Sequence, residues 1–553
     1  MDKNRSMSGK VRPVTMKGFS LLAGGSGYRV HVIFQGLAVG LTAGFASILY
    51  RILLGQAERF SFFALSGEEP IPIPLLVPLW CLAAWVIGRI MEWEPLARGS
   101  GIPQVEGELL GQISMNWWRV LTAKFLGGAL SIALGLSLGR EGPSIQIGSA
   151  SGKGIARLGK KDTLEERLMI SSGASAGLSA AFNAPLAGVV FALEEVHKSF
   201  SPLILLSAMT ASLAADAVSK YVFGLGPIFS FGAPEPLPLG LYGYLLLLGV
   251  LCGVGGALFC RLILSVQDLY GKIAVAPRYR IVLPALAAVI VGPALPLVLG
   301  GGLPMVEHLA HHGGSLGFIL SLFLVNLLFT AFSFGSGAPG GIFLPMLAQG
   351  AALGALYGTA VAQLCGVDPS TVTNFLVVGM AGFFTAVVRA PITGILLITE
   401  MTGSFSHLLA VSLVALTAHM TADLLKARPI YDALLVRLLR RSADSRGQRD
   451  LLLEASICPG SPLDGRAIRE AALPKGCLLV HVLRGDEKIL PRGDTVLAVG
   501  DRLIALADGS RARRVREVLL ELAGVPCQRG RGYVPPGEGE DDLRDAGGDR
   551  RGE

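Results

Sequence analysis

Long apolar segments alternate with short polar connections along most of the chain. An apolar run of about 20 residues is long enough to cross a membrane as a helix. Runs near 30 residues can hold two pieces, and an interrupted run such as 343–364 is expected to enter only halfway, so the number of crossings stays open. The pattern predicts a polytopic all-α membrane protein. Its apolar segments are residues 32–54, 72–91, 118–138, 169–193, 202–223, 238–265, 279–299, 315–334, 343–364, 374–399 and 406–425.

Composition agrees with this pattern. The 553 residues are 51% hydrophobic and 16% charged, and the mean hydropathy is +0.56. The net charge of +7 is spread over both ends of the chain, including a basic segment at residues 1–29 without a secretory signal. Basic ends are typical of the cytosolic side, so we expect both termini to be cytosolic and no nucleic-acid partner. The seven cysteines are scattered and predict neither a disulfide framework nor a metal site.

The motif Gly139-Arg140-Glu141-Gly142-Pro143 places two charges inside a long apolar run. Charges at membrane depth are costly and tend to mark ion or proton paths. The two glycines permit tight turns and proline favours the first turn of a helix, so a helix is expected to begin near Glu141 inside the membrane. The unpaired N–H groups of such a helix start form an anion site. The Glu141 carboxylate would compete with an anion for these donors.

The chain also contains an internal repeat. Pro143 aligns with Pro345 at an offset of 202 residues, and a second set of matches follows at an offset of 206. Broken helices at matching places in two apolar halves indicate a transporter site at the repeat interface. We therefore predict membrane repeats at residues 30–232 and 233–435. The second set pairs Gly173 with Gly379, Ala184-Pro185 with Ala390-Pro391, Gly188 with Gly394 and Glu194 with Glu400.

A further turn-permissive motif is Gly99-Ser100-Gly101-Ile102-Pro103. It also leads into a predicted helix start, with a hydroxyl in place of a carboxylate. Ser100 either donates a hydrogen bond to an anion without adding negative charge or acts as an ordinary helix cap.

The motifs at residues 99–103, 139–143 and Gly341-Ile342-Phe343-Leu344-Pro345 resemble, in order and spacing, the three signature motifs of the CLC chloride channels and chloride/proton exchangers. The resemblance covers about residues 30–435. It implies an inverted repeat of broken and tilted helices whose N-termini converge on chloride. It also implies a homodimer with one pore in each subunit.

The resemblance further implies residue roles. Ser100 and the Tyr431 hydroxyl would bind the central chloride, and the N–H groups of Ile342 and Phe343 would complete that site. Glu141 resembles the external gating glutamate, which occupies an anion position when ionised and swings away carrying a proton when protonated. Gly139, Arg140, Gly142 and Pro143 would support it.

The adjacent residues Glu194 and Glu195 help to separate an exchanger from a channel. Their side chains point about 100° apart on a helix, so they should not share a role. Glu194 matches Glu400 in the repeat, which suggests a shared structural duty such as pairing or capping, whereas Glu195 has only Met401 opposite. From the residues alone, both could equally be interfacial glutamates in water. The resemblance implies that Glu195 is the internal proton glutamate of exchangers.

Other polar residues are weaker candidates for a site. Lys124 resembles a buried lysine near the anion path of the family, and it either raises local anion affinity or snorkels to the interface. His308, His311 and His312 lie in a Gly-rich connection where a solvated loop is favoured over a metal site. We expect no metal and no cofactor.

A small soluble α/β domain is predicted after the membrane region. Residues 436–451 are predicted to form a linker, 452–523 the domain and 524–553 a disordered tail. Strands are predicted at residues 478–483 and 502–506, and a polar helix at 510–522. The motifs Ile489-Leu490-Pro491-Arg492-Gly493-Asp494 and Val499-Gly500-Asp501-Arg502-Leu503 resemble the RCK/TrkA C-terminal domain. The domain would either sense an unknown small ligand or serve dimerisation and stability.

Taken together with the motifs, the resemblance to the CLC family implies a secondary active chloride/proton antiporter in the inner or plasma membrane. A passive voltage- or pH-gated chloride channel with the same pore is the alternative. A membrane-embedded enzyme using Glu141 as an acid is a third hypothesis, but the chain contains no HExxH or phosphate-loop motif.

Overall fold

A computed structural model describes most of the chain, which divides into two compact units at residues 1–439 and 440–553. The predictions for the basic N-terminus up to residue 25 and for the tail after residue 523 lie outside the described residues. The described ranges are 26–66, 71–198, 200–229, 231, 236–445, 451–458, 460–471, 473–474, 476–484, 487–507 and 512–523.

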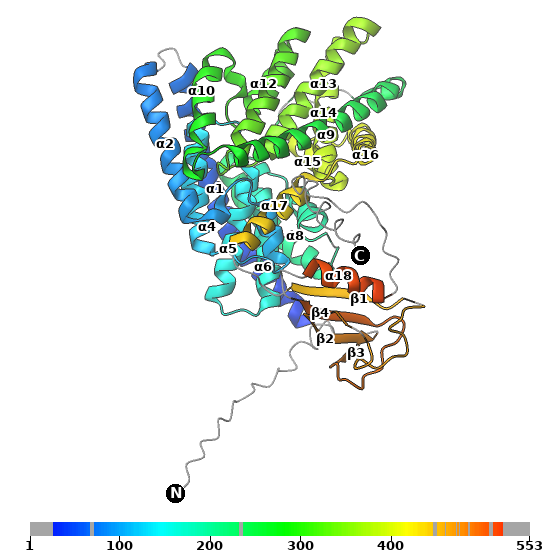
Figure 1. Cartoon of the computed structure of the whole chain (residues 1–553). Helices are drawn as coiled ribbons and strands as arrows, with labels where there is room; N and C mark the ends of the chain where they lie inside the picture. Colours follow the sequence, from blue (N-terminus) through cyan, green and yellow to red (C-terminus); the bar gives the residue numbers. More distant parts are fainter. Residues whose placement is uncertain are drawn as a thin grey trace, which may run out of the picture. The chain divides into compact units, whose positions relative to one another are not determined.

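The first unit is built of helices (Figure 1). Its first half contains α1 (Ser26–Ser66), α2 (Ile73–Trp93), α3 (Ile102–Leu109), α4 (Trp117–Ala133), α5 (Glu141–Leu158), α6 (Thr163–Phe182), α7 (Pro185–Phe191) and α8 (Pro202–Phe223). Its second half contains α9 (Tyr242–Lys272), α10 (Val282–Ala294), α11 (Leu303–His311), α12 (Leu316–Gly335), α13 (Phe343–Cys365), α14 (Val372–Val388), α15 (Pro391–Thr402) and α16 (Leu408–Leu424). Helix α17 (Ile430–Ser445) follows, and short 3-10 turns lie at Pro95–Ala97, Leu239–Leu241, Pro277–Tyr279, Pro296–Val298 and Pro369–Thr371.

The two halves repeat one packing plan, which confirms the predicted duplication. Helix α5 packs on α6 as α13 packs on α14, and α1 packs on α8 as α9 packs on α16. The halves meet where α7 packs on α15. They also meet at Gly139 and Gly341, whose backbones form an isolated antiparallel bridge. An antiparallel junction between equivalent positions is what an inverted repeat produces.

The polytopic all-α prediction is confirmed, with differences in the individual segments. Among the described residues, seven helices are long and apolar enough to cross a membrane. The runs 169–193 and 374–399 each hold two helices. The run 343–364 forms the single helix α13, which is continuous over 23 residues. Its glycines serve close packing: a Cβ added at Gly350 would lie 2.5 Å from the Gly379 carbonyl oxygen on α14.

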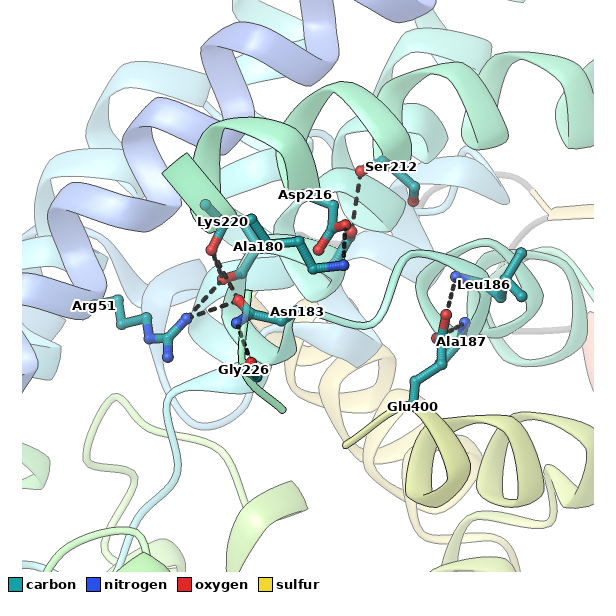
Figure 2. A network of polar contacts seen from close by, with 12 residues as sticks. Arg51, Ala180, Asn183, Leu186, Ala187, Ser212, Asp216, Lys220, Gly226 and Glu400 are labelled. Carbon is teal, nitrogen blue, oxygen red and sulfur yellow. Dashed lines mark hydrogen bonds and ion pairs between the residues drawn. The ribbon is translucent and has the colours of Figure 1, made fainter. Parts of the chain in front are cut away.

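Polar side chains fix the break between α6 and α7 in the first half (Figure 2). Asn183 ends α6 in the left-handed conformation, with φ of 52°. Its Oδ1 accepts hydrogen bonds from Arg51 Nη1 and Ser219 Oγ, both at 3.0 Å. Asparagine tolerates this conformation better than most residues, so it can end one helix just before Pro185 begins the next.

In the part that the structure describes, the second unit contains a four-stranded antiparallel sheet and helix α18. The strands are β1 (Leu451–Ser456), β2 (Cys477–Arg484), β3 (Glu487–Ile489) and β4 (Arg502–Ala507), in the order β1-β4-β2-β3, and α18 spans Ala512–Leu522. The predicted strands at 478–483 and 502–506 correspond to β2 and β4. The sequence missed β1, which begins inside the predicted linker, and β3, which has only three residues. Leu463, Val482, Leu503 and Leu519 lie in its core.

An ion pair in this second unit predicts an effect of pH on its stability. Arg484 Nε and Nη2 donate to the two carboxylate oxygens of Asp501 at 2.8 and 2.7 Å. The Ala498 N–H also donates to Asp501, at 2.9 Å. The hydrogen bonds from the Arg484 guanidinium hold the pKa of Asp501 below its ordinary value. Ionised Asp501 therefore stabilises the unit at pH values above the ordinary aspartate pKa. This stabilisation is lost as the pH falls through the lowered pKa of Asp501 in the folded unit.

Asp501→Asn is expected to lower the free energy of unfolding of this unit at pH 7 by about 1–3 kcal/mol, the cost of disturbing a hydrogen bond to a charged group. The deficit relative to the wild type should shrink in acid, where the wild type also loses its charge. Pulsed hydrogen exchange of the β4 amides in the full chain, between pH 7 and pH 3, measures both effects. Asp494→Asn, at an exposed aspartate of the same unit, is the control. A constant deficit at every pH would contradict the role of the Asp501 charge.

Candidate functional site

The three glycine motifs meet at the centre of the first unit. The Gly139 N–H donates to the Gly341 carbonyl oxygen at 2.7 Å, and the Gly341 N–H donates back to the Gly139 carbonyl oxygen at 2.8 Å. The Gly340 N–H donates to the Gly99 carbonyl oxygen at 3.0 Å. A Cβ added at Gly142 would lie 2.7 Å from the Ser100 carbonyl oxygen, closer than real side chains approach. These glycines therefore allow three loops to pack backbone against backbone.

Glu141 lies at the junction of the two halves. It begins α5, as predicted, and its side chain is fully buried. Its Oε2 accepts a hydrogen bond from the Leu344 N–H at 3.3 Å, so the carboxylate caps α13 of the other half. Arg140 Nε lies 3.8 Å from Glu141 Oε1. The carboxylate thus occupies a helix N-terminus, where the helix dipole and the free N–H groups favour an anion.

The tip of α13 is held by aromatic packing. Phe343 is fully buried, and its ring lies 4.7 Å from that of Phe384 and 5.3 Å from that of Phe182, measured between centroids. Among the described residues, no hydrogen bond is found from the N–H group of Ile342 or Phe343. These two donors are the ones that the family resemblance assigns to an anion. The aromatic cluster was not predicted, because spacing along the chain does not reveal contacts between distant phenylalanines.

Two buried hydroxyls lie close to the same region. Ser100 is 2% exposed and Tyr431 is fully buried. The Tyr431 hydroxyl lies beside Ser100 and within electrostatic reach of Glu141 and Glu195. Neither hydroxyl has a well-formed hydrogen bond to another described residue. Since buried polar groups normally have partners, two orphaned hydroxyls side by side fit an anion that accepts from both.

Lys124 anchors the loop that carries Ser100. Its side chain is fully buried, and Nζ donates to the carbonyl oxygens of Ala97 at 2.9 Å and Gly99 at 2.6 Å. The snorkelling interpretation is therefore wrong. Gln146 of α5 donates to the Leu96 carbonyl oxygen at 2.8 Å, a second anchor that the sequence did not reveal.

Glu194 and Glu400 cap each other's half of the protein. Glu194 Oε2 accepts from the Thr393 N–H at 2.7 Å, at the start of α15. In return, Glu400 Oε2 accepts from the Ala187 N–H at 2.8 Å, at the start of α7 (Figure 2). The expectation of a shared capping duty for the matched glutamates agrees with this geometry. These contacts give Glu194 a structural role distinct from that of its neighbour.

Glu195 has a different environment from Glu194. It lies in a π-helical turn, Ala192–Val196, and is 5% exposed. Its Oε1 has no hydrogen-bond partner among the described residues. Single π-helical turns occur often at functional sites. The alternative of two glutamates in water does not fit, because Glu195 is buried.

A cavity that is partly open to solvent lies beside Glu141. Arg140 and Leu344, both contacts of Glu141, line it together with Glu58 of α1. The remaining lining residues are Leu54, Gly55, Ile132, Leu138, Gly301 and Leu303. Glu58 was missed because the predicted apolar segment ended at residue 54. The signal was available, since an acidic residue interrupts an otherwise apolar helix there.

The histidine cluster takes a different form from the expected loop. His308 and His311 belong to α11, and the ring of His308 stacks on that of His312 with centroids 5.0 Å apart. The loop prediction is wrong because the helix begins after Gly302, whose φ of 89° ends the preceding turn. Within the described ranges, no group of three or more His, Cys, Asp or Glu side chains could hold a metal ion.

Comparisons with known proteins agree with these observations. The family model described as voltage gated chloride channel matches residues 79–423, and the TrkA-C domain model matches residues 452–520. The H(+)/Cl(-) exchange transporter ClcA of Vibrio cholerae serotype O1 is 37% identical and aligns over 74% of this chain and 90% of its own length. The ClcA protein of Salmonella typhimurium is 33% identical, over 76% of this chain and 91% of its own.

Solved structures give the same picture. The crystal structure of a slow cyanobacterial Cl-/H+ antiporter is 30% identical, with a TM-score of 0.71 over 75% of this chain and 99% of its own. A CLC-type fluoride/proton antiporter, 23% identical with a TM-score of 0.60 over 73% of this chain and 96% of its own, shares the fold.

Proposed function

Because the chain belongs to the voltage-gated chloride channel family, we propose that it is a secondary active antiporter, which moves chloride across the membrane in exchange for protons. One observation carries the proposal: the buried carboxylate of Glu141 accepts a hydrogen bond from the Leu344 N–H at the tip of α13. A helix N-terminus binds anions, so carboxylate and chloride compete for one set of donors. The proteins named above as H(+)/Cl(-) exchange transporters and Cl-/H+ antiporter support exchange over passive conduction.

In the proposed cycle, ionised Glu141 holds the α13 tip and blocks the chloride path. Protonation removes the charge that the N–H groups attract, so the side chain leaves and chloride takes its place. The departing side chain carries the proton toward the cavity lined by Glu58 and Arg140. Since the donors bind either the carboxylate or chloride, movement of one ion requires movement of the other.

The hydroxyls of Ser100 and Tyr431 and the N–H groups of Ile342 and Phe343 would hold chloride at the central site. A hydroxyl and an amide both donate hydrogen bonds without adding negative charge, which suits a halide. Lys124 would support this site by fixing the Ser100 loop through the Ala97 and Gly99 carbonyls.

Glu195 would exchange protons with the cytosol. Its burial and its unpartnered Oε1 set it apart from Glu194, which is engaged as a cap. A channel with the same pore would not need a proton acceptor at this position. Membership in a transport family also gives no support to the hypothesis of a membrane-embedded enzyme.

The chain is a multi-pass membrane protein, and we place it in the inner or plasma membrane with both termini cytosolic. We further propose a homodimer with one pore in each subunit. The TrkA-C domain at residues 452–520 would regulate transport, either by binding a small ligand or by stabilising the dimer.

Purified protein in liposomes tests the proposal. An outward chloride gradient at equal internal and external pH should drive protons inward, against the proton gradient that then develops. Clamping the membrane potential with potassium and valinomycin excludes passive proton leak as the cause. If chloride flows without proton movement under every clamp, the protein is a passive chloride channel.

A further inference from the structure

Lys198 links the segment that carries Glu195 to two neighbouring helices. Its Nζ donates to Glu106 Oε1 at 2.7 Å and also to Asp432 Oδ1. Glu106 belongs to α3 and Asp432 to the first turn of α17. One ammonium group thus connects three elements that are distant in the sequence.

Each of these elements carries, or directly follows, a residue of the proposed transport site. Helix α3 begins two residues after Ser100, Tyr431 directly precedes Asp432 on α17, and Glu195 lies three residues before Lys198. We propose that Lys198 is a positioning residue of the proton path, which neutralises the carboxylates around Glu195 so that Glu195 can both take up and release a proton. This inference rests on the antiporter function proposed above.

The charges around Glu195 are otherwise negative. Glu106, Asp432 and Glu194 all act on it, and Lys198 is the positive group whose field opposes theirs. The turn also packs on α6 and α8; from α6, Arg167 acts on His197, next to Lys198. Without the lysine, ionised Glu195 would face two more carboxylates with their charge uncompensated. Repulsion between like charges would then favour the protonated form of Glu195.

The two partners of Lys198 should contribute unequally. The Glu106 side chain is 5% exposed, whereas that of Asp432 is 45% exposed. Charges near water are strongly screened, so the pair with Asp432 is weak and the pair with Glu106 dominates.

The backbone at Lys198 is consistent with a specific position for its side chain. Its φ is 53°, in the left-handed region that residues with a Cβ rarely adopt. Such conformations cost free energy and persist where surrounding contacts fix them. The side chain of Lys198 makes such contacts to α3 and α17.

Replacing the lysine tests the proposal in liposomes. Lys198→Met should shift the dependence of proton flux on internal pH toward alkaline pH by about one unit, because the remaining negative charges then favour the protonated form of Glu195. Lys198→Arg keeps the charge and should retain the wild-type profile. Lys220→Met is the matched control, because Lys220 also donates to a buried carboxylate, Asp216, at 2.7 Å, but belongs to the last turn of α8. It should not shift the profile.

A second variant separates charge from tethering. In Lys198→Met combined with Glu106→Gln, no tether is restored but the excess negative charge is removed, so the pH midpoint should return toward the wild type. Combining Lys198→Met with Asp432→Asn should return it less. If Lys198→Met leaves the profile unchanged, or if removing Glu106 does not restore it, the proposal is overturned. A wild-type protein without proton coupling would instead refute the antiporter function itself, and thermal unfolding of each variant identifies any that fail to fold.

Discussion

Replacing Glu141 with alanine is expected to abolish proton transport while chloride continues to pass. The Glu141 carboxylate accepts a hydrogen bond from the Leu344 N–H. Its removal leaves the N–H groups at the tip of α13 permanently available to an anion. Proton flux should fall by at least about 100-fold, the lower end of what a positioned proton-transfer group contributes. Chloride flux should lose its dependence on pH, because no competing group remains to be protonated. Paired chloride-electrode and pH-electrode recordings from the same liposomes measure both.

Glu141→Gln is the informative companion variant. Glutamine keeps the size of the side chain and cannot ionise, so it should also lose proton transport. Its amide can still accept a hydrogen bond from Leu344, which predicts slower chloride flux than in Glu141→Ala. Proton pumping retained in either variant would contradict the role assigned to this residue.

Replacing Glu195 with glutamine should likewise stop proton transport, by about 100-fold or more on the same scale, but through a different step. Here the gate at Glu141 remains intact, so chloride flux should continue and keep a dependence on external pH. The two variants are therefore distinguishable by the pH dependence of their chloride flux. If Glu195 were idle, as the channel hypothesis requires, the substitution would alter neither flux.

Glu194→Gln is the matched control for Glu195→Gln, since the two residues are adjacent. Glu194 caps α15 through Thr393, so its replacement should destabilise the protein by about 1 kcal/mol, typical of a lost helix cap. The ratio of protons to chloride should not change. A changed ratio in Glu194→Gln would show that the two glutamates do not have separate duties.

The sequence predicted the features that depend on local pattern. The start of α5 at Glu141 followed from glycine and proline positions, and the capping duty of Glu194 followed from its match with Glu400. The first feature depends only on residues close together in the chain, and the second depends only on the constant offset between the two repeats. The aromatic cluster around Phe343 and the anchor at Gln146 depend on contacts across the fold, which no spacing along the chain encodes.

The errors have physical causes as well. Lys124 has the length of a snorkelling residue, and only its burial against two carbonyls decides otherwise. Lys198 carries no motif, because its significance comes from α3 and α17, which approach it only after folding.

The exchanged caps have a consequence for how the protein is made. The N–H of Ala187 is satisfied by Glu400, which lies 213 residues later in the chain. Since chains emerge from the ribosome N-terminus first, α7 enters the bilayer with an open end that can be closed only when the second repeat has arrived. In a nascent chain that stops before residue 400, the N–H groups at the start of α7 therefore stay without a hydrogen-bond acceptor in lipid. We expect a membrane protease to recognise such an incomplete chain by this uncapped helix end.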